Sequence, residues 1–131
     1  MKKIIASALL LPVLTFAPPR LAQVTIDFQS LPTIEQLIEV VKSATRDKNY
    51  STALRVANNA IKQFPDYATA YFYRAIALSN LGKIEEAKLD FEQAKKLYLS
   101  QLKSGKISAQ EKNEVQVKLE TIERQLKLLQ S

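Results

Sequence analysis

The feature that most restricts the fold of this 131-residue chain is a recurrence of side-chain size 34 positions apart. When the segment that starts at Ile34 is moved forward by 34 residues, small residues largely fall on small ones and bulky residues on bulky ones. The matched pairs are Leu37 with Tyr71, Val41 with Ala75, Ala44 with Leu78, Tyr50 with Ile84, Ala53 with Ala87, and Ala60 with Ala94. A period of this length indicates a repeat array, in which each unit buries its apolar face against its neighbours.

Each copy of the recurrence is typical of a helical hairpin. Ala53 and Ala60 stand seven residues apart, as do Ala87 and Ala94, so each pair lies on one face of a helix and lets a neighbouring helix approach closely. Gly82 falls where the first helix of its copy must end, in a left-handed conformation that a residue without a Cβ adopts freely. With 47% hydrophobic residues but only two glycines, the composition favours packed helices.

The apolar periodicity predicts five helices, over residues 33–47, 51–63, 67–81, 84–103 and 108–130. Two of the helix starts carry the pattern of a capping box, at residues 33–36 (TIEQ) and 108–111 (SAQE), in which paired side chains satisfy the first backbone N–H groups. Ser51 and Asp66 are expected to act as simpler caps.

The second copy resembles the tetratricopeptide repeat, which has this period and a characteristic order of an aromatic, a small and a bulky residue, a turn glycine, and then alanine, aromatic, alanine. The residues that carry the resemblance are Tyr71, Ala75, Leu78, Gly82, Ala87, Phe91 and Ala94. The first copy departs from the pattern at Leu37 and Lys48 but ends at Pro65, where the family has a closing proline. The resemblance implies an all-α fold, with two antiparallel helical hairpins of an α-solenoid over residues 33–103.

The resemblance also implies a concave groove, lined by the first helix of each hairpin, that binds a protein or peptide partner. Carried across residue by residue, the groove positions are Glu35, Ile38, Lys42 and Thr45 in the first copy and Thr69, Phe72, Ile76 and Ser79 in the second. From this row and the neighbouring Tyr73, the candidate partner-binding residues are Ile38, Lys42, Phe72, Tyr73, Ile76 and Ser79. Lys42 is the only cation among them, so the groove suits a hydrophobic segment better than a clamped carboxylate. In the alternative interpretation, Phe72 and Ile76 pack beneath the last helix or the preceding linker and no groove is open.

The last predicted helix, residues 108–130, carries a narrow apolar seam. Its members alternate at spacings of four and three and are Val115, Leu119, Ile122, Leu126 and Leu129. We expect this helix to fold back on the second hairpin, as the cap that a short repeat array requires. The alternative is a structural subunit or homodimer that is joined through the seam as a coiled coil.

The first residues are typical of an export signal. Lys2 and Lys3 precede an apolar stretch over residues 4–16 that is shorter than the roughly 20 residues of a membrane-spanning helix. We therefore predict a secretory signal peptide over residues 1–22, an extended linker over residues 23–32 and no permanent membrane span. The expected location is a periplasm, the outside of the cell or an internal lumen.

The remaining composition argues against catalysis and against cofactor, metal or nucleic-acid binding. The chain has no cysteine and no histidine, which removes thiolate and imidazole metal ligands and the commonest general base. Residues 23–131 carry 16 basic and 13 acidic residues, interspersed rather than clustered, so no nucleic-acid footprint is expected. We predict an exported protein–protein interaction module that assists assembly of an envelope complex. An enzyme that uses Glu35 and Lys42 is the alternative from another class.

Overall fold

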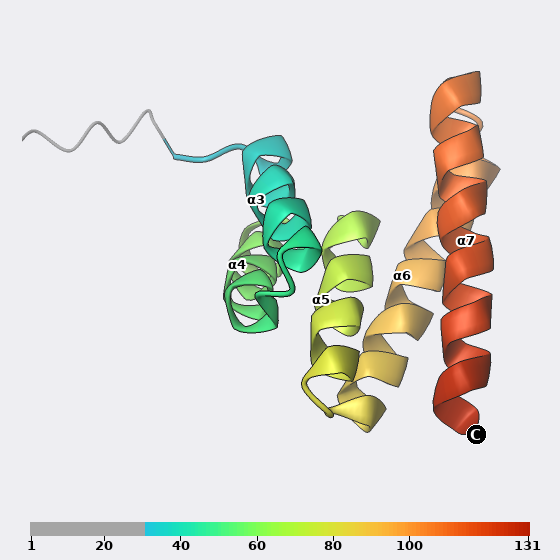
Figure 1. Ribbon diagram of the computed structural model, residues 1–131. Helices are drawn as coiled ribbons and strands as arrows, with labels where there is room; N and C mark the ends of the chain where they lie inside the picture. Colours follow the sequence, from blue (N-terminus) through green and yellow to red (C-terminus); the bar gives the residue numbers. More distant parts are fainter. Residues whose placement is uncertain (1–30) are drawn as a thin grey trace, which may run out of the picture. The chain divides into compact units, whose positions relative to one another are not determined.

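The computed structural model describes residues 31–131, and within that range the chain is entirely helical apart from its turns (Figure 1). The elements are α3 (Ile34–Arg46), α4 (Tyr50–Gln63), α5 (Ala68–Asn80), α6 (Ile84–Ser104) and α7 (Ala109–Gln130). The five predicted helices are all present, each end lies within one residue of the predicted one, and the all-α class is confirmed. The predicted signal peptide and most of the predicted linker lie outside the described residues.

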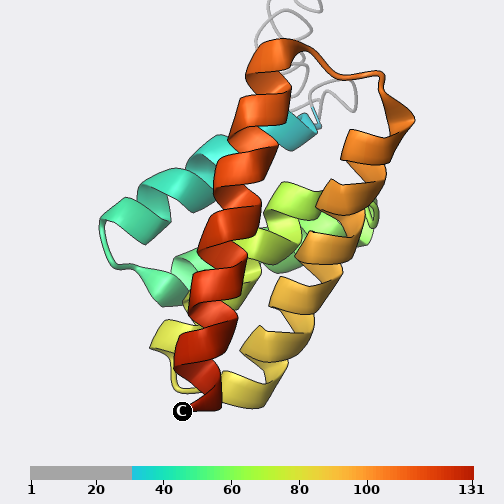
Figure 2. The same cartoon turned by 90° about the vertical axis from the view of Figure 1, so that its right-hand side faces the viewer.

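The helices form two antiparallel hairpins, α3 with α4 and α5 with α6, followed by α7. Each helix packs on the next one along the chain, and α3 also packs on α5. In Figure 1, α3, α5 and α7 run in one direction and α4 and α6 in the other, and Figure 2 shows α7 lying along α6. Within the described range, none of these helices has both the length and the apolar character that crossing a membrane would need.

The same turn closes both hairpins. In the first hairpin, the amides of Lys48 and Asn49 donate to carbonyl groups three and five positions earlier, at 3.1 and 2.8 Å. In the second hairpin, Gly82 and Lys83 repeat both bonds at the same two distances. This pair of bonds needs a left-handed residue just after the helix, and Lys48 (φ 58°) and Gly82 (φ 81°) both supply it. The departure from the repeat pattern at Lys48 therefore changes the residue but not the turn.

The helix starts agree only in part with the predicted caps. Both capping boxes are present, at Thr33 and at Ser108. The prediction of Ser51 is wrong, because the turn ends one residue earlier and the side chain of Asn49 accepts the capping hydrogen bond. The prediction of Asp66 is wrong as well, because α5 begins later and the residue at its cap position makes no side-chain hydrogen bond.

Two apolar clusters hold the array together. The first cluster joins α3, α4 and α5 and consists of Leu37, Ile38, Val41, Ala44, Ala53, Val56, Ala57, Ala60, Ala70 and Ala77. The four alanines matched by the recurrence, Ala53, Ala60, Ala87 and Ala94, are all fully buried. Their small side chains therefore face neighbouring helices as predicted and allow close helix approach.

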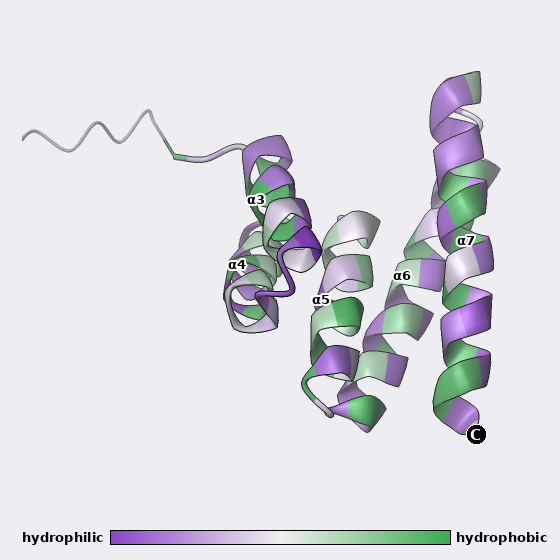
Figure 3. Ribbon diagram, in the orientation of Figure 1, coloured by the Kyte–Doolittle hydropathy of each residue, from purple (hydrophilic) through white to green (hydrophobic). Residues whose placement is uncertain are grey.

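The second cluster joins α5, α6 and α7. It is built around Phe72, Phe91 and Tyr98, against which the seam of α7 packs. Val115, Ile122 and Leu126 are buried there, and Leu119 and Leu129 pack on the cluster's edge. Figure 3 shows apolar and polar residues interleaved around α7, as expected of a helix with one covered face. The seam is thus covered by the chain's own α5 and α6, which leaves little of it for a second copy.

Candidate interaction surface

A hollow of about 420 Å³ opens on the side of α5 where α3 and α7 approach each other. We call it the lysine hollow, and it is lined by Lys42, Tyr73, Asn113, Glu114, Val117 and Lys118. One of these residues comes from α3, one from α5 and four from α7. The hollow therefore depends on α7 lying beside α5, where the first helix of a third hairpin would be placed.

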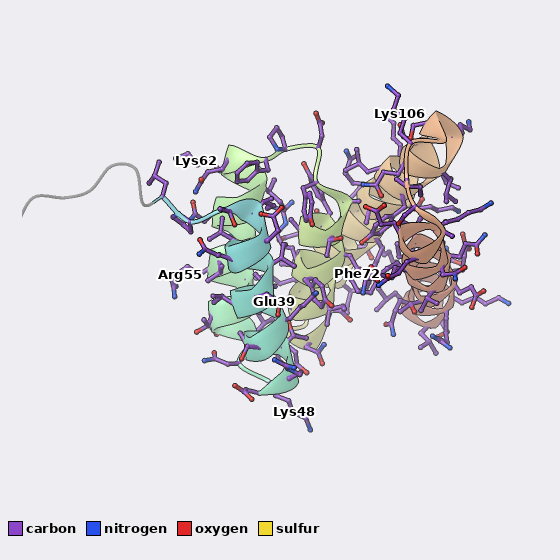
Figure 4. The ribbon with its side chains drawn as sticks, turned by 90° about the horizontal axis from the view of Figure 1, so that it is seen from above. Glu39, Lys48, Arg55, Lys62, Phe72 and Lys106 are labelled. Carbon is purple, nitrogen blue, oxygen red and sulfur yellow. The ribbon has the colours of Figure 1, made fainter. Side chains whose placement is uncertain are left out.

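The six candidate groove residues do not share one environment. Lys42 and Tyr73 line the lysine hollow. Ile38 and Phe72 are each 4% exposed and lie in the core beneath this face. Figure 4 shows Phe72 on the side of α5 that faces α7. Ile76 is half-buried and packs on the second cluster.

The last of the six candidates, Ser79, is half-buried near the end of α5 and does not line the lysine hollow. Ser79 takes part in the hairpin turn, where its backbone carbonyl accepts a hydrogen bond from the Gly82 amide. The structure therefore brings together two of the six residues at an open surface and places the others in or beside the core.

Lys118 is one of the four α7 residues on this face that the sequence pattern did not indicate. Its Nζ lies 4.8 Å from the ring centroid of Phe72 and 5.3 Å from that of Tyr73. The two rings meet edge to face, with 5.2 Å between their centroids. An ammonium group over aromatic rings is attracted by their negative faces, so Lys118 links α7 to the aromatic pair of α5.

Lys42 presents a second positive charge from the opposite wall. Its Nζ donates to Glu39 Oε1 at 3.0 Å, one turn earlier on α3. This hydrogen bond raises the pKa of Lys42, so the side chain is ionised at neutral pH. Because both partners are exposed, the bond contributes little to stability and leaves the ammonium available to a ligand.

A second hollow, of about 230 Å³, adjoins the first where α5 and α7 begin. We call it the tyrosine hollow, and it is lined by Tyr67, Thr69, Tyr98, Gln101, Ile107, Glu111, Glu114, Val115 and Lys118. The hydroxyl groups of Tyr98 and Thr69 share a hydrogen bond of 2.8 Å. Burial raises the pKa of Tyr98, so its phenol stays protonated. Glu114 and Lys118 line both hollows, so the two hollows are neighbouring parts of one surface.

A comparison with known families identifies the repeat. The family model described as the tetratricopeptide repeat matches residues 56–88, which run from the middle of α4 through α5 into the first turns of α6. Residues 56–88 are therefore similar to a tetratricopeptide repeat. No curated protein matches the chain. Tetratricopeptide repeats are in general non-catalytic modules that bind other proteins, so the match suggests a protein–protein interaction module.

Among residues 31–131, the most buried charge lies away from the two hollows. Asp90 is 6% exposed and accepts two hydrogen bonds from Arg74, at 2.6 and 2.7 Å. The same guanidinium donates to Asn58 at 3.1 Å, so the cluster joins α4, α5 and α6. The bonds to Asp90 raise the pKa of Arg74. Every member has a partner, and the arrangement is that of a tie between the two hairpins rather than a reactive site.

Proposed function

We propose that this protein is an exported interaction module that holds a segment of a protein or peptide partner in the lysine hollow and assists assembly of an envelope complex. The observation that carries the proposal is the lysine hollow itself, which three helices form around Tyr73. Residues 1–22, with the pattern of a secretory signal, support the exported location.

The chemistry of the hollow suits a segment that combines apolar and acidic groups. Tyr73 offers a half-buried aromatic surface and Val117, which is 61% exposed, an apolar one. Lys42 and Lys118 offer ammonium groups on opposite walls. Aromatic residues surrounded by polar groups are typical of the energetically dominant part of protein interfaces. A partner side chain that enters the hollow can therefore gain both burial and charge pairing.

Site-specific photo-crosslinking tests this surface directly. A benzophenone amino acid replaces Tyr73 in one chain and Leu89 in a control chain, both expressed in the native cells. Leu89 is 71% exposed on α6 and lines neither hollow, so it controls for random collisions. We expect discrete crosslinked products from position 73 that are absent from position 89. Equal products from both positions, or none from position 73, would refute binding at the lysine hollow.

The exported location needs its own measurement. Mass spectrometry of the chain recovered from native cells should show a mature form that begins at Gln23, in the envelope or external fraction. A chain that keeps Met1 to Ala22 and stays in the cytosolic fraction would contradict export without affecting the crosslinking result.

A further inference from the structure

The tyrosine hollow exists because α6 is longer than its counterpart in the first hairpin. Helix α4 has 14 residues, whereas α6 has 21, which adds two turns at its C-terminal end. Tyr98 and Gln101 lie on these extra turns, and α7 begins only after them. The first turns of α7 are thereby carried past the start of α5, and the hollow lies between the three elements.

The base of the tyrosine hollow is held in place. Tyr98 is 3% exposed, and its bond to Thr69 fixes the hydroxyl groups of both side chains. The apolar side chains of Ile107 and Val115 form part of the walls. At about 230 Å³ the hollow is smaller than a typical small-molecule pocket, which holds about 300 Å³ or more, so a single side chain of a partner fits its size.

The charged groups of the hollow favour a cation. Glu111 accepts a hydrogen bond from the Ser108 amide at 2.7 Å, and this bond keeps the pKa of Glu111 below its ordinary value. Glu114 accepts from the side chain of Gln110 at 3.3 Å. Each bond occupies one oxygen of its carboxylate, which leaves the other for a ligand. The opposing charge, the ammonium of Lys118, lies over the rings of α5 instead of pairing with these carboxylates.

We propose that the tyrosine hollow is a subsite for an arginine side chain of the partner segment, whose guanidinium pairs with Glu114 and Glu111. This inference rests on the proposed function, because it assigns the chemistry of one residue in the bound segment. Arginine fits better than lysine, since its planar guanidinium bonds carboxylates with two N–H groups and also packs on tyrosine rings. The stem of the arginine then lies against the apolar walls.

Nuclear magnetic resonance titration with a small probe tests the subsite. The probe is N-acetyl-arginine methylamide, and its control is the citrulline counterpart, which has nearly the same shape and no charge. With arginine we expect saturable shifts of the amides of Thr69, Gln101 and Glu114. With citrulline we expect affinity lower by about tenfold, because charge-assisted hydrogen bonds are lost.

A pair of variants assigns the effect to one carboxylate. Glu114→Gln removes a charge from the hollow, whereas Glu120→Gln removes one from an exposed residue of α7 that lines neither hollow. We expect the first to weaken arginine binding about tenfold and the second to leave it unchanged. Circular dichroism should show both variants folded, since both side chains are exposed.

Three outcomes would overturn the subsite: no saturable shift, equal shifts with citrulline, or shifts confined to the lysine hollow. If photo-crosslinking at position 73 still succeeds, only the arginine subsite fails and the proposed function stands. If crosslinking fails while arginine still binds, the proposed lysine-hollow contact fails instead.

Discussion

Replacing Lys48 with glycine should stabilise the protein, although the change removes a side chain. Lys48 holds a left-handed conformation (φ 58°) at the position where the second hairpin has Gly82. A residue with a Cβ is strained in this conformation by about 1–2 kcal/mol. Glycine removes the strain but increases the conformational entropy of the unfolded chain, which lowers the free energy of unfolding by about 0.5–1 kcal/mol. We expect the free energy of unfolding to rise by about 0.5–1 kcal/mol and the melting temperature by about 4 °C.

Urea denaturation followed by helical circular dichroism measures this change, with two variants as controls. Gly82→Ala should lose about 0.5–1 kcal/mol, because its new Cβ meets no atom within 4 Å and only the left-handed strain remains. Lys62→Gly, at an exposed helical position in α4, should lose about 0.7 kcal/mol. The reasoning fails if Lys48→Gly is destabilised as much as Lys62→Gly, because the left-handed φ of Lys48 would then have no effect on stability.

Three further predictions concern the core. Asp90→Ala should lower the free energy of unfolding by about 2–4 kcal/mol in urea titrations, because it leaves the Arg74 guanidinium without its buried carboxylate. Because burial raises the pKa of Tyr98, the folded state keeps a proton that the unfolded chain releases near pH 10. Stability should therefore fall steadily as the pH rises above about 9, and less steeply in Tyr98→Phe. Ile122→Ala should cost about 2–4 kcal/mol without changing the mass in sedimentation, whereas Leu128→Ala, which alters a 62% exposed residue, should stay within about 0.5 kcal/mol of wild type.

The helices could be predicted because their signals are local. Alanine spacing, capping residues and the turn glycine act within one or two turns of chain, and the matched alanines are buried as their spacing required. The cap predictions at Ser51 and Asp66 failed by a residue or two, where a turn ends one position earlier or later than composition suggests. Local rules thus specified the helices but not the exact residue at which each one begins.

The candidate site was less predictable because it depends on where α7 docks. Phe72 and Tyr73 are neighbours in the sequence, yet one is buried under α7 and the other lines the lysine hollow. A difference of one residue turns a side chain by about 100° around a helix, and only the covering helix decides which of the two stays open. Lys118 was missed for the same reason.

The tie between Arg74 and Asp90 was also missed. The two residues are 16 positions apart on different helices, and both are of charged types that usually lie at the surface. Their pairing depends on how α5 and α6 pack against each other, which the periodicity of a single helix does not predict. The two-turn extension of α6 had a similar effect, since it shifted α7 out of the 34-residue recurrence.

One helix of this protein both completes the hydrophobic core and supplies most of the lysine hollow. If the proposed segment binds there, its binding and the docking of α7 are thermodynamically linked: the bound segment would slow hydrogen exchange along α7, and a change that loosens the helix would weaken binding. Deleting α7 would thus uncover the apolar residues of α5 and α6 and remove most of the lysine hollow in the same step.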